Sequence, residues 1–332
     1  MKRTFQFGFR VAIAIAAYLF ISIKIGSSGI LQITDVLYSS FASVNLFWLL
    51  LVLALMPLVW GLEALKWRIA LSPFATISFL RSWRSVWYGV VAGQLTPNRI
   101  GEPVGRLALI EPNIRGKAGV AAVWCSLSQQ SITVFFGLLS FFWWILIVKQ
   151  QVLPEGSHVW LIYLSIIFWT ALVLIAIFEI NWFTSLIERI GWVKRALHGE
   201  SIRIGYKRSL GFTIFGISAL RYLLFSTQYV ILLKVFGVQA NTTDLYAAVG
   251  LTYLFSSFVP SFSASEVGVR AGFATWFVGM LCNNPAGVTA ASLLLWLLNL
   301  AVPALIGAWF KWRVKNDAST GSELSNQEGE KK

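Results

Sequence analysis

The sequence is poor in charged residues and in the residues from which soluble enzymes build catalytic and metal sites. Only 12% of the 332 residues are charged, whereas soluble domains carry about 25%. Acidic side chains number 14, and there are two histidines and two cysteines. A chain with so few charged residues cannot cover a folded surface with solvated groups, so a water-soluble fold is excluded.

The few reactive side chains do not form a catalytic pattern. His158 and His198 are expected in loops away from any carboxylate cluster, so metal or general acid–base catalysis lacks its usual groups. Cys125 and Cys282 have neither metal-ligand spacing nor a disulfide framework. No phosphate-binding loop of the Walker type occurs. The sequence therefore predicts no metal, no cofactor and no enzyme activity, and any transport is expected to be downhill, ion-coupled or partner-driven.

Apolar residues are abundant and fall in long runs. Hydrophobic residues make up 57% of the chain, and a run of about 20 residues forms about 30 Å of helix, the thickness of the hydrocarbon core. These runs predict an all-α polytopic membrane protein with six crossing helices. The six are Val11 to Ile25 with its flanks, Leu46 to Leu65, Ala118 to Val148, Val159 to Phe178, Leu210 to Phe236 and Val288 to Phe310.

Two further apolar stretches are too short to cross. Ser85 to Leu95 and Leu245 to Phe258 give about 17 and 21 Å of helix before a break that contains proline. The first is flanked by basic residues, whereas the second lies between Asp244 and an uncharged loop at 282–287. Each is therefore expected to enter and leave from one side of the membrane, as a re-entrant hairpin, the first from the cytoplasm and the second from outside.

The distribution of basic residues predicts how the chain is oriented. Lysine and arginine gather at both termini and in the loop near Gly205, whereas the loop near Gly156 has few. By the positive-inside rule both termini are cytoplasmic and the protein is a multi-pass protein of the cell (inner) membrane. The same distribution accounts for the net charge of +13, so no nucleic-acid partner is expected. Residues 316–332 are too polar to fold and are predicted to form a disordered tail.

The order of elements repeats within one transmembrane domain, residues 1–315. Each half, about 1–150 and 159–315, has two crossings, a re-entrant hairpin and a third crossing. Three crossings invert the second half, which predicts an inverted-topology repeat. Transporters of this kind bind substrate near the membrane midplane, between broken helices, so we expect both hairpin tips to face one polar cavity.

The two breaks share a motif. Residues 96–106 and 260–270 each contain a proline, a small polar linker and Glu-x-x-x-Arg, beginning at Glu102 and Glu266. This spacing places the acid and the base on one helical face. The predicted break residues are Pro97, Gly101, Pro260, Ser263 and Ser265.

Two interpretations of the charged residues remain open. The Glu–Arg pairs either brace the hairpin tips or form a site for an anionic headgroup. In the second interpretation the arginines bind the lipid phosphate and Glu102 and Glu266 hold them when the site is empty. The predicted substrate-binding residues are Arg99, Glu102, Arg106, Arg221, Glu266 and Arg270.

Polar residues within the crossing helices give a second group of candidates. Arg221 lies in the middle of its predicted span and needs a partner from another helix, for which Glu102 and Glu266 are the candidates. Other polar side chains are expected either to line the cavity or to pack between helices. These are Ser128, Gln129, Gln130 and Gln228.

The hairpin motifs resemble those of a known family. Leu95 to Glu102, followed by Arg106, resembles the "TPGRAGE…R" signature of the flippase-like family, also called the lysylphosphatidylglycerol synthase transmembrane-region family. Pro260 with Glu266 to Arg270 is similar to its "P…GG…GVRE" segment. The resemblance covers about residues 1 to 315. The chain departs from the family at Ala271, where an acid is usual, and after the first hairpin, where Glu-Arg is common.

The resemblance implies a function in lipid transport. Family members fused to a soluble domain make aminoacylated phosphatidylglycerol, and their membrane part is associated with flipping it. For this chain it implies the flippase part alone, acting on an anionic phospholipid or a polyprenyl-phosphate-linked lipid, with a lipid-modifying enzyme as a further partner. The alternatives are a membrane-embedded lipid-modifying enzyme, with Glu102 or Glu266 as base, and a non-transporting scaffold for such an enzyme.

Overall fold

The computed structural model describes residues 46–94, 96, 99–145, 164, 167, 168, 170, 171, 185, 205–259 and 263–308. These residues form helices and turns and contain no strand. Four helical stretches among them are long and apolar enough to cross a membrane, Leu46–Leu71, Pro112–Trp143, Arg208–Val235 and Pro285–Ala308. The predicted all-helical membrane class is confirmed. Most of the predicted spans 11–25 and 159–178 lies outside the described residues.

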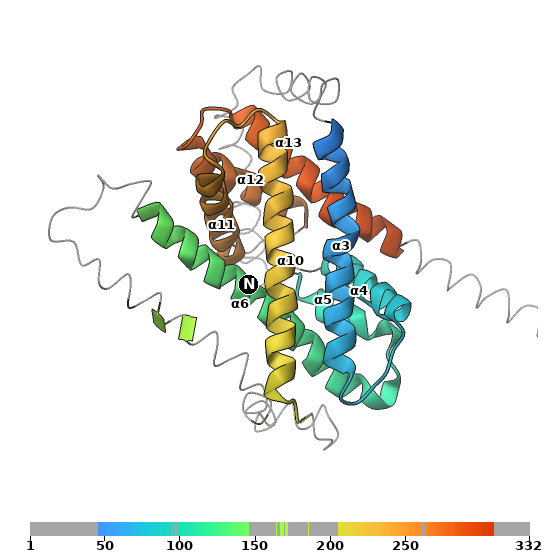
Figure 1. Ribbon diagram of the computed structural model, residues 1–332. Coiled ribbons are helices and arrows are strands. Elements are labelled where there is room, and N and C mark those ends of the chain that lie inside the picture. The colour runs from blue at the N-terminus through green and yellow to red at the C-terminus, as the bar shows by residue number, and fades with distance from the viewer. Residues whose placement is uncertain are drawn as a thin grey trace, which may run out of the picture.

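Two long helices run antiparallel through the molecule. Helix α3 spans Leu46–Leu71 and packs against α10, which spans Arg208–Val235 (Figure 1). The side-chain amide of Gln228 on α10 donates to the carbonyl of Val52 on α3, at 2.9 Å. Helix α3 continues past the predicted end at Leu65 because its last turns are buried in the protein.

A helical hairpin follows α3. Helix α4 (Phe79–Gln94) packs against the short α5 (Gly101–Gly105) and the 3-10 turn Arg106–Leu109. Glycine permits this close packing, because a Cβ on Gly105 would lie 2.6 Å from the Cβ of Ala92. A second 3-10 turn, Pro112–Ile114, leads into α6 (Arg115–Trp143).

A second helical hairpin follows α10. Helix α11 (Thr242–Phe258) and α12 (Ser263–Gly279) pack together, and α13 (Pro285–Trp296) continues as a π-helix at Leu297–Ala301. In Figure 1 the α4/α5 hairpin lies level with the lower half of α10 and the α11/α12 hairpin level with its upper half. The two hairpins therefore lie at different levels along α10, and their entry from opposite sides of a membrane stays a prediction.

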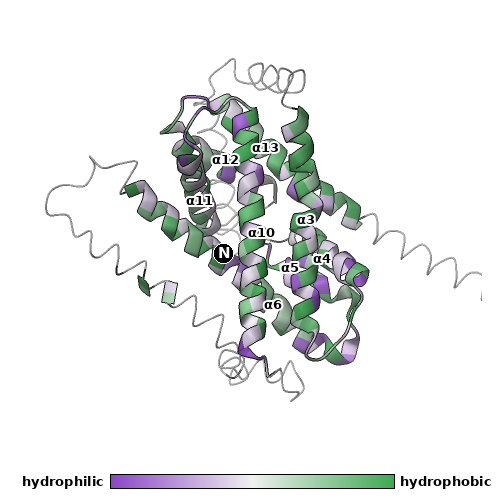
Figure 2. Cartoon of the chain, viewed as in Figure 1, coloured by the Kyte–Doolittle hydropathy of each residue, from purple (hydrophilic) through white to green (hydrophobic). Residues whose placement is uncertain are grey.

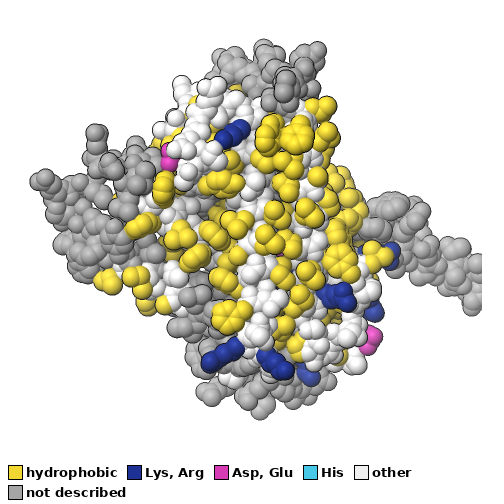
Figure 3. All heavy atoms as spheres, viewed as in Figure 1, with side chains coloured by type: hydrophobic (Ala, Val, Ile, Leu, Met, Phe, Trp, Pro, Cys, Tyr) yellow, Lys and Arg dark blue, Asp and Glu magenta, His cyan; other side chains and the backbone are white. Residues whose placement is uncertain are grey.

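Buried side chains form two clusters, one for each hairpin. The first groups α3, α4 and α6 around Trp67 and Trp124, and the second groups α10 to α13 around Tyr229 and Tyr253. Hydrophobic residues predominate along most of the helices (Figure 2). Exposed lysine and arginine gather at the end of the molecule where α3 ends and α10 begins (Figure 3). This is the end that the sequence assigns to the cytoplasm.

Candidate functional site

A buried carboxylate on α3 is the centre of a charged network. Glu63 is 3% exposed and forms ion pairs with three basic side chains. Its oxygens lie 2.8 Å from Lys66 Nζ, 2.7 Å from Arg106 Nη2 and 3.4 Å from Arg221 Nε. Lys66 is fully buried and also donates to the side chains of Gln129 and Ser218 on neighbouring helices. The network therefore connects α3, α6, α10 and the first hairpin.

The network continues to the tip of the first hairpin. Arg106 Nη2 also donates to Glu102 Oε1 at 2.8 Å, and the second oxygen of Glu102 pairs with Arg99 at 3.1 Å. Arg106 is 1% exposed, whereas the Arg99 side chain is 28% exposed. A continuous series of ion pairs thus runs from the buried Glu63 to Arg99 at the tip.

The backbone at this tip has an unusual conformation. Arg99 has φ +57°, and it is the one non-glycine residue with positive φ among the described residues. This conformation costs a residue that has a Cβ atom about 1 to 2 kcal/mol, and residues held in it cluster at functional sites. The hydroxyl of Thr96 accepts the backbone N–H of Gly101 at 2.8 Å, which closes the turn beside it. The ion pair to Glu102 offsets part of the cost.

The second hairpin contributes a separate ion pair. On α12, Arg270 Nη2 donates to Glu266 Oε1 at 2.7 Å. The guanidinium also lies 5.4 Å from the ring centroid of Tyr253 and 5.9 Å from that of Phe225. Cation–π contacts of this kind hold a guanidinium in place while leaving donors free.

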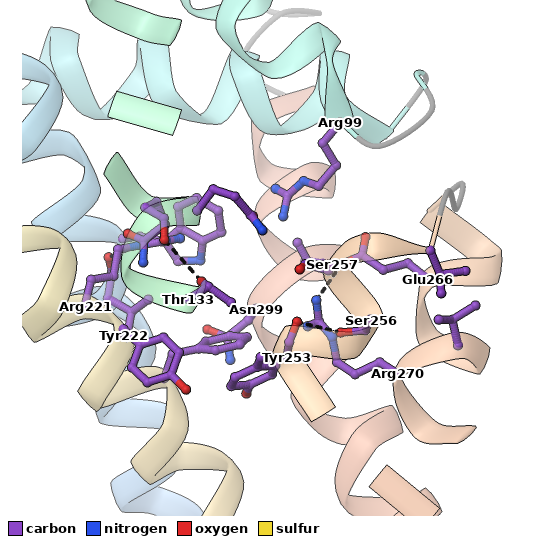
Figure 4. A pocket seen from close by; sticks show the side chains of 18 residues that line it. Arg99, Thr133, Arg221, Tyr222, Tyr253, Ser256, Ser257, Glu266, Arg270 and Asn299 are labelled. Carbon is purple, nitrogen blue, oxygen red and sulfur yellow. Dashed lines mark hydrogen bonds and ion pairs between the residues drawn. The ribbon is translucent and has the colours of Figure 1, made fainter. Parts of the chain in front are cut away.

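A cavity of about 260 Å³ lies between these two groups of charges. Its walls come from α3, α6, α10, α11, α12, the π-helix and the first hairpin tip. Arg99 reaches into it from the tip, with Arg221 on another side and Glu266 and Arg270 across it (Figure 4). The lining residues with polar or ionic groups include Arg99, Arg221, Tyr253, Glu266, Arg270 and Asn299.

Several polar atoms at the cavity wall are buried without a hydrogen-bond partner. They are the Nε atoms of Arg99 and Arg270, the hydroxyl of Tyr253 and Oδ1 of Asn299. Asn299 lies in the π-helix and donates through its amide to Gln228 at 3.1 Å, which fixes its orientation. Burying an unpaired polar group costs about 1 to 3 kcal/mol, and π-helical turns occur frequently at functional sites. These atoms are therefore suited to a polar ligand.

Comparison with protein families gives a match that covers both hairpins and the cavity. The family described as Lysylphosphatidylglycerol synthase TM region matches residues 9–307. The chain belongs to this family. Comparisons of this lysylphosphatidylglycerol synthase TM region protein with curated proteins and with solved structures gave no match.

In this family member, some of the predicted site residues line the cavity. They are Arg99, Arg221, Glu266 and Arg270, together with Gln129 and Gln130 from the second group. Glu102 and Arg106 lie behind them in the charged network and do not line the cavity. The predicted contact of Arg106 with a lipid phosphate would therefore require the cavity wall to open, and its observed role is to hold Glu63 and Glu102.

The remaining predicted residues have other positions. Ser128 is buried away from the cavity, and Gln228 holds Asn299. Gly101 allows the hairpin tip to close, because a Cβ there would lie 2.6 Å from the carbonyl of Ala92. Ser265 and the backbone of Ser263 belong to the start of α12, whereas Pro97 and Pro260 lie outside the described residues. The meeting of the two prolines therefore stays a prediction.

The structure adds two residues that the sequence does not identify, Glu63 and Lys66. The sequence presents Lys66 as a charge flanking a span and offers Glu102 or Glu266 as the partner of Arg221. In the structure the partner of Arg221 is Glu63, and Lys66 is fully buried beside it. The available signal was the spacing of Glu63 and Lys66, which places an acid and a base on one face of an apolar helix.

Proposed function

We propose that this chain is a lipid transporter that binds the phosphate of an anionic phospholipid or a polyprenyl-phosphate-linked lipid in the cavity. Membership in the lysylphosphatidylglycerol synthase TM region family and four membrane-length helices support a lipid-related role in a membrane. In the proposed arrangement the protein has six crossings and two re-entrant hairpins, with both termini in the cytoplasm. Its partners are a membrane lipid and a lipid-modifying enzyme.

The observation that carries the proposal is the convergence of three arginines on one cavity. Arg99, Arg221 and Arg270 come from the first hairpin, α10 and the second hairpin, and all three line it. Guanidinium groups bind phosphate through charge-assisted, paired hydrogen bonds. In the proposed arrangement the two hairpins enter from opposite sides of the membrane, so a headgroup in this cavity would lie between them, as alternating access requires.

Transport rather than chemistry is favoured by the state of the cavity carboxylate. Glu266 is the carboxylate that lines the cavity, and it already accepts a hydrogen bond from Arg270. A general base must be free to accept a proton from its substrate. In the proposed mechanism Glu266 instead releases Arg270 to the phosphate when the lipid enters.

Leaflet exchange in proteoliposomes tests the proposal. Purified wild-type protein is expected to accelerate movement of a labelled anionic phospholipid between leaflets. Arg221→Gln and Arg270→Gln should reduce this rate at least about tenfold, because an amide supplies no charge to the phosphate. Arg68→Gln is the matched control, since Arg68 is exposed at the end of α3. If both cavity variants fold and exchange lipid at the wild-type rate, the cavity is not the headgroup site.

A further inference from the structure

The charges around the cavity do not balance. Among the described residues, the charged network and the Glu266–Arg270 pair contain five basic and three acidic side chains. The basic ones are Lys66, Arg99, Arg106, Arg221 and Arg270, and the acidic ones are Glu63, Glu102 and Glu266. The described residues of the site therefore carry an excess of two positive charges.

The carboxylates already present cannot neutralise this excess. Glu63 contacts three cations and Glu102 contacts two, so each is shared among more positive charges than it can balance. Unpaired charges are costly inside a membrane protein, where little water can screen them. The excess is best neutralised by an anion that enters the cavity.

Unpaired donors locate where such an anion would bind. The Nε atoms of Arg99 and Arg270 are buried and have no hydrogen-bond partner, although each arginine also holds a carboxylate through Nη2. Arg221 lines the same cavity, makes its hydrogen bond and its ion pair through Nε, and lies over the ring of Trp60. An anion with several oxygens could accept hydrogen bonds from more than one of these arginines at once.

We propose that the transported lipid ends in a headgroup with two negative charges, a phosphate monoester, in preference to a phosphodiester. This inference rests on the proposed function. A phosphodiester such as phosphatidylglycerol carries one negative charge and leaves one positive charge uncompensated. An aminoacylated phosphatidylglycerol adds positive charge to the site, so it fits less well still. The lipid class that fits includes phosphatidic acid and polyprenyl phosphates.

Binding of lipids that share acyl chains and differ in headgroup charge tests this inference. Dissociation constants would be measured for the purified full-length protein in detergent by native mass spectrometry. At pH 8, phosphatidic acid should bind at least about tenfold more tightly than phosphatidylglycerol, and phosphatidylcholine should bind most weakly. Polyprenyl phosphate should resemble phosphatidic acid. Equal affinities for phosphatidic acid and phosphatidylglycerol would contradict the inference.

The dependence of this preference on pH separates the lipid charge from other differences between headgroups. The dianion of a phosphate monoester takes up one proton near pH 6, whereas a phosphodiester keeps its single negative charge between pH 8 and pH 5.5. The preference for phosphatidic acid should therefore fall about threefold as the pH falls from 8 to 5.5. The ionisable groups facing the cavity are Arg99, Arg221, Tyr222, Tyr253, Glu266 and Arg270. Loss of negative charge from the protein would maintain or raise the ratio of the two affinities, so a fall in this ratio at low pH reports protonation of the lipid phosphate. A ratio that does not change with pH would contradict the inference.

Two substitutions in one ion pair should change the preference in opposite directions. Arg270→Gln removes a positive charge and should lower the ratio of the two affinities about tenfold, whereas Glu266→Gln removes a negative charge and should maintain or raise it. A pair that only braces the hairpin would make both variants bind all lipids less well without changing the ratio. Arg99→Gln replaces Arg270→Gln if that variant does not fold, and Arg68→Gln is the control.

The outcomes distinguish this inference from the proposed function. If Arg270→Gln weakens the binding of both lipids and the wild type does not prefer phosphatidic acid, the cavity binds lipid headgroups but does not select those with two negative charges. If Arg270→Gln and Arg99→Gln alter the binding of neither lipid, the proposed function fails as well. Inorganic phosphate is tested as a soluble ligand. If it binds and phosphatidic acid does not, the site selects a dianion that is not a lipid, and both the proposed function and this inference fail.

Discussion

At the scale of single residues, Glu63 has the most contacts with charged groups in the described part of the chain. Its carboxylate forms ion pairs with Lys66, one turn further along α3, with Arg106 in the first hairpin and with Arg221 on α10. Removing one partner from a buried ionic network leaves the others uncompensated. Glu63 is therefore expected to stabilise the folded protein whether or not a ligand is bound.

Glu63→Gln should lower the free energy of unfolding by about 3 to 5 kcal/mol, because three cations lose their shared counter-charge. The measurement is the midpoint of thermal unfolding in detergent. Glu111→Gln is the matched control, since Glu111 is exposed and should change stability by about 0.5 kcal/mol or less. A Glu63→Gln variant that unfolds at the wild-type temperature would show that the network contributes nothing to stability.

The residues of the site were predictable where a motif marks them or where a polar residue lies in the middle of a predicted span. Arg99 and the two Glu-x-x-x-Arg pairs follow from the broken helices, and four of the six predicted substrate-binding residues line the cavity. Glu63 and Lys66 have no such motif. Lys66 follows an apolar run, where the sequence presents it as a charge flanking a span. The contacts of Glu63 with Arg106 and Arg221 depend on distant segments.

At the scale of elements, the breaks were predictable because short apolar length and proline act locally. Helix α11 ends at Phe258 and α12 begins at Ser263, at the predicted break. The beginning of α4 was less predictable. It starts at Phe79, six residues before the apolar run, because Arg81 is exposed there and donates to the carbonyl of Leu109. By hydropathy, Arg81 lies outside the predicted helix. In the structure it belongs to the helix, and its charge is satisfied by the carbonyl of Leu109.

Gly105→Ala should destabilise the first hairpin by about 1 to 3 kcal/mol, because the added Cβ would lie 2.6 Å from both Ala92 Cβ and the Tyr88 carbonyl. Thermal unfolding of the purified variant provides the measurement. Gly216→Ala on α10 is the control, since nothing lies within 4 Å of its Cβ, and it should be neutral or stabilising by about 1 kcal/mol. Equal effects of the two substitutions would mean that α4 and α5 do not pack this closely.

At the scale of the whole molecule, the account depends on two hairpins that enter from opposite sides of the membrane. The described helices have the required order, and exposed basic residues gather at one end (Figure 3). The sequence predicts this asymmetry because charge and hydropathy are properties of single segments. It does not predict how the two halves meet, since that depends on side-chain contacts between them.

Cysteine labelling in intact cells tests the orientation. In a background with Cys125→Ala and Cys282→Ala, a membrane-impermeant maleimide should label Glu155→Cys from outside and should not label Lys207→Cys until the cells are opened. The reason is that the loop near Gly205 is rich in basic residues and the loop near Gly156 is not. External labelling at position 207 would reverse the topology, and with it the sides from which the hairpins enter.

The central claim is that the cavity between the hairpins holds a lipid phosphate, and an experimental structure of the wild-type protein in a lipid bilayer disc containing an anionic phospholipid tests it most directly. The account predicts density for a phosphate within hydrogen-bonding distance of at least two of Arg99, Arg221 and Arg270, with the acyl chains leaving the cavity toward the bilayer. A structure in which anionic lipid is resolved only on the outer surface of the helices, with the cavity arginines still paired as described, would contradict it.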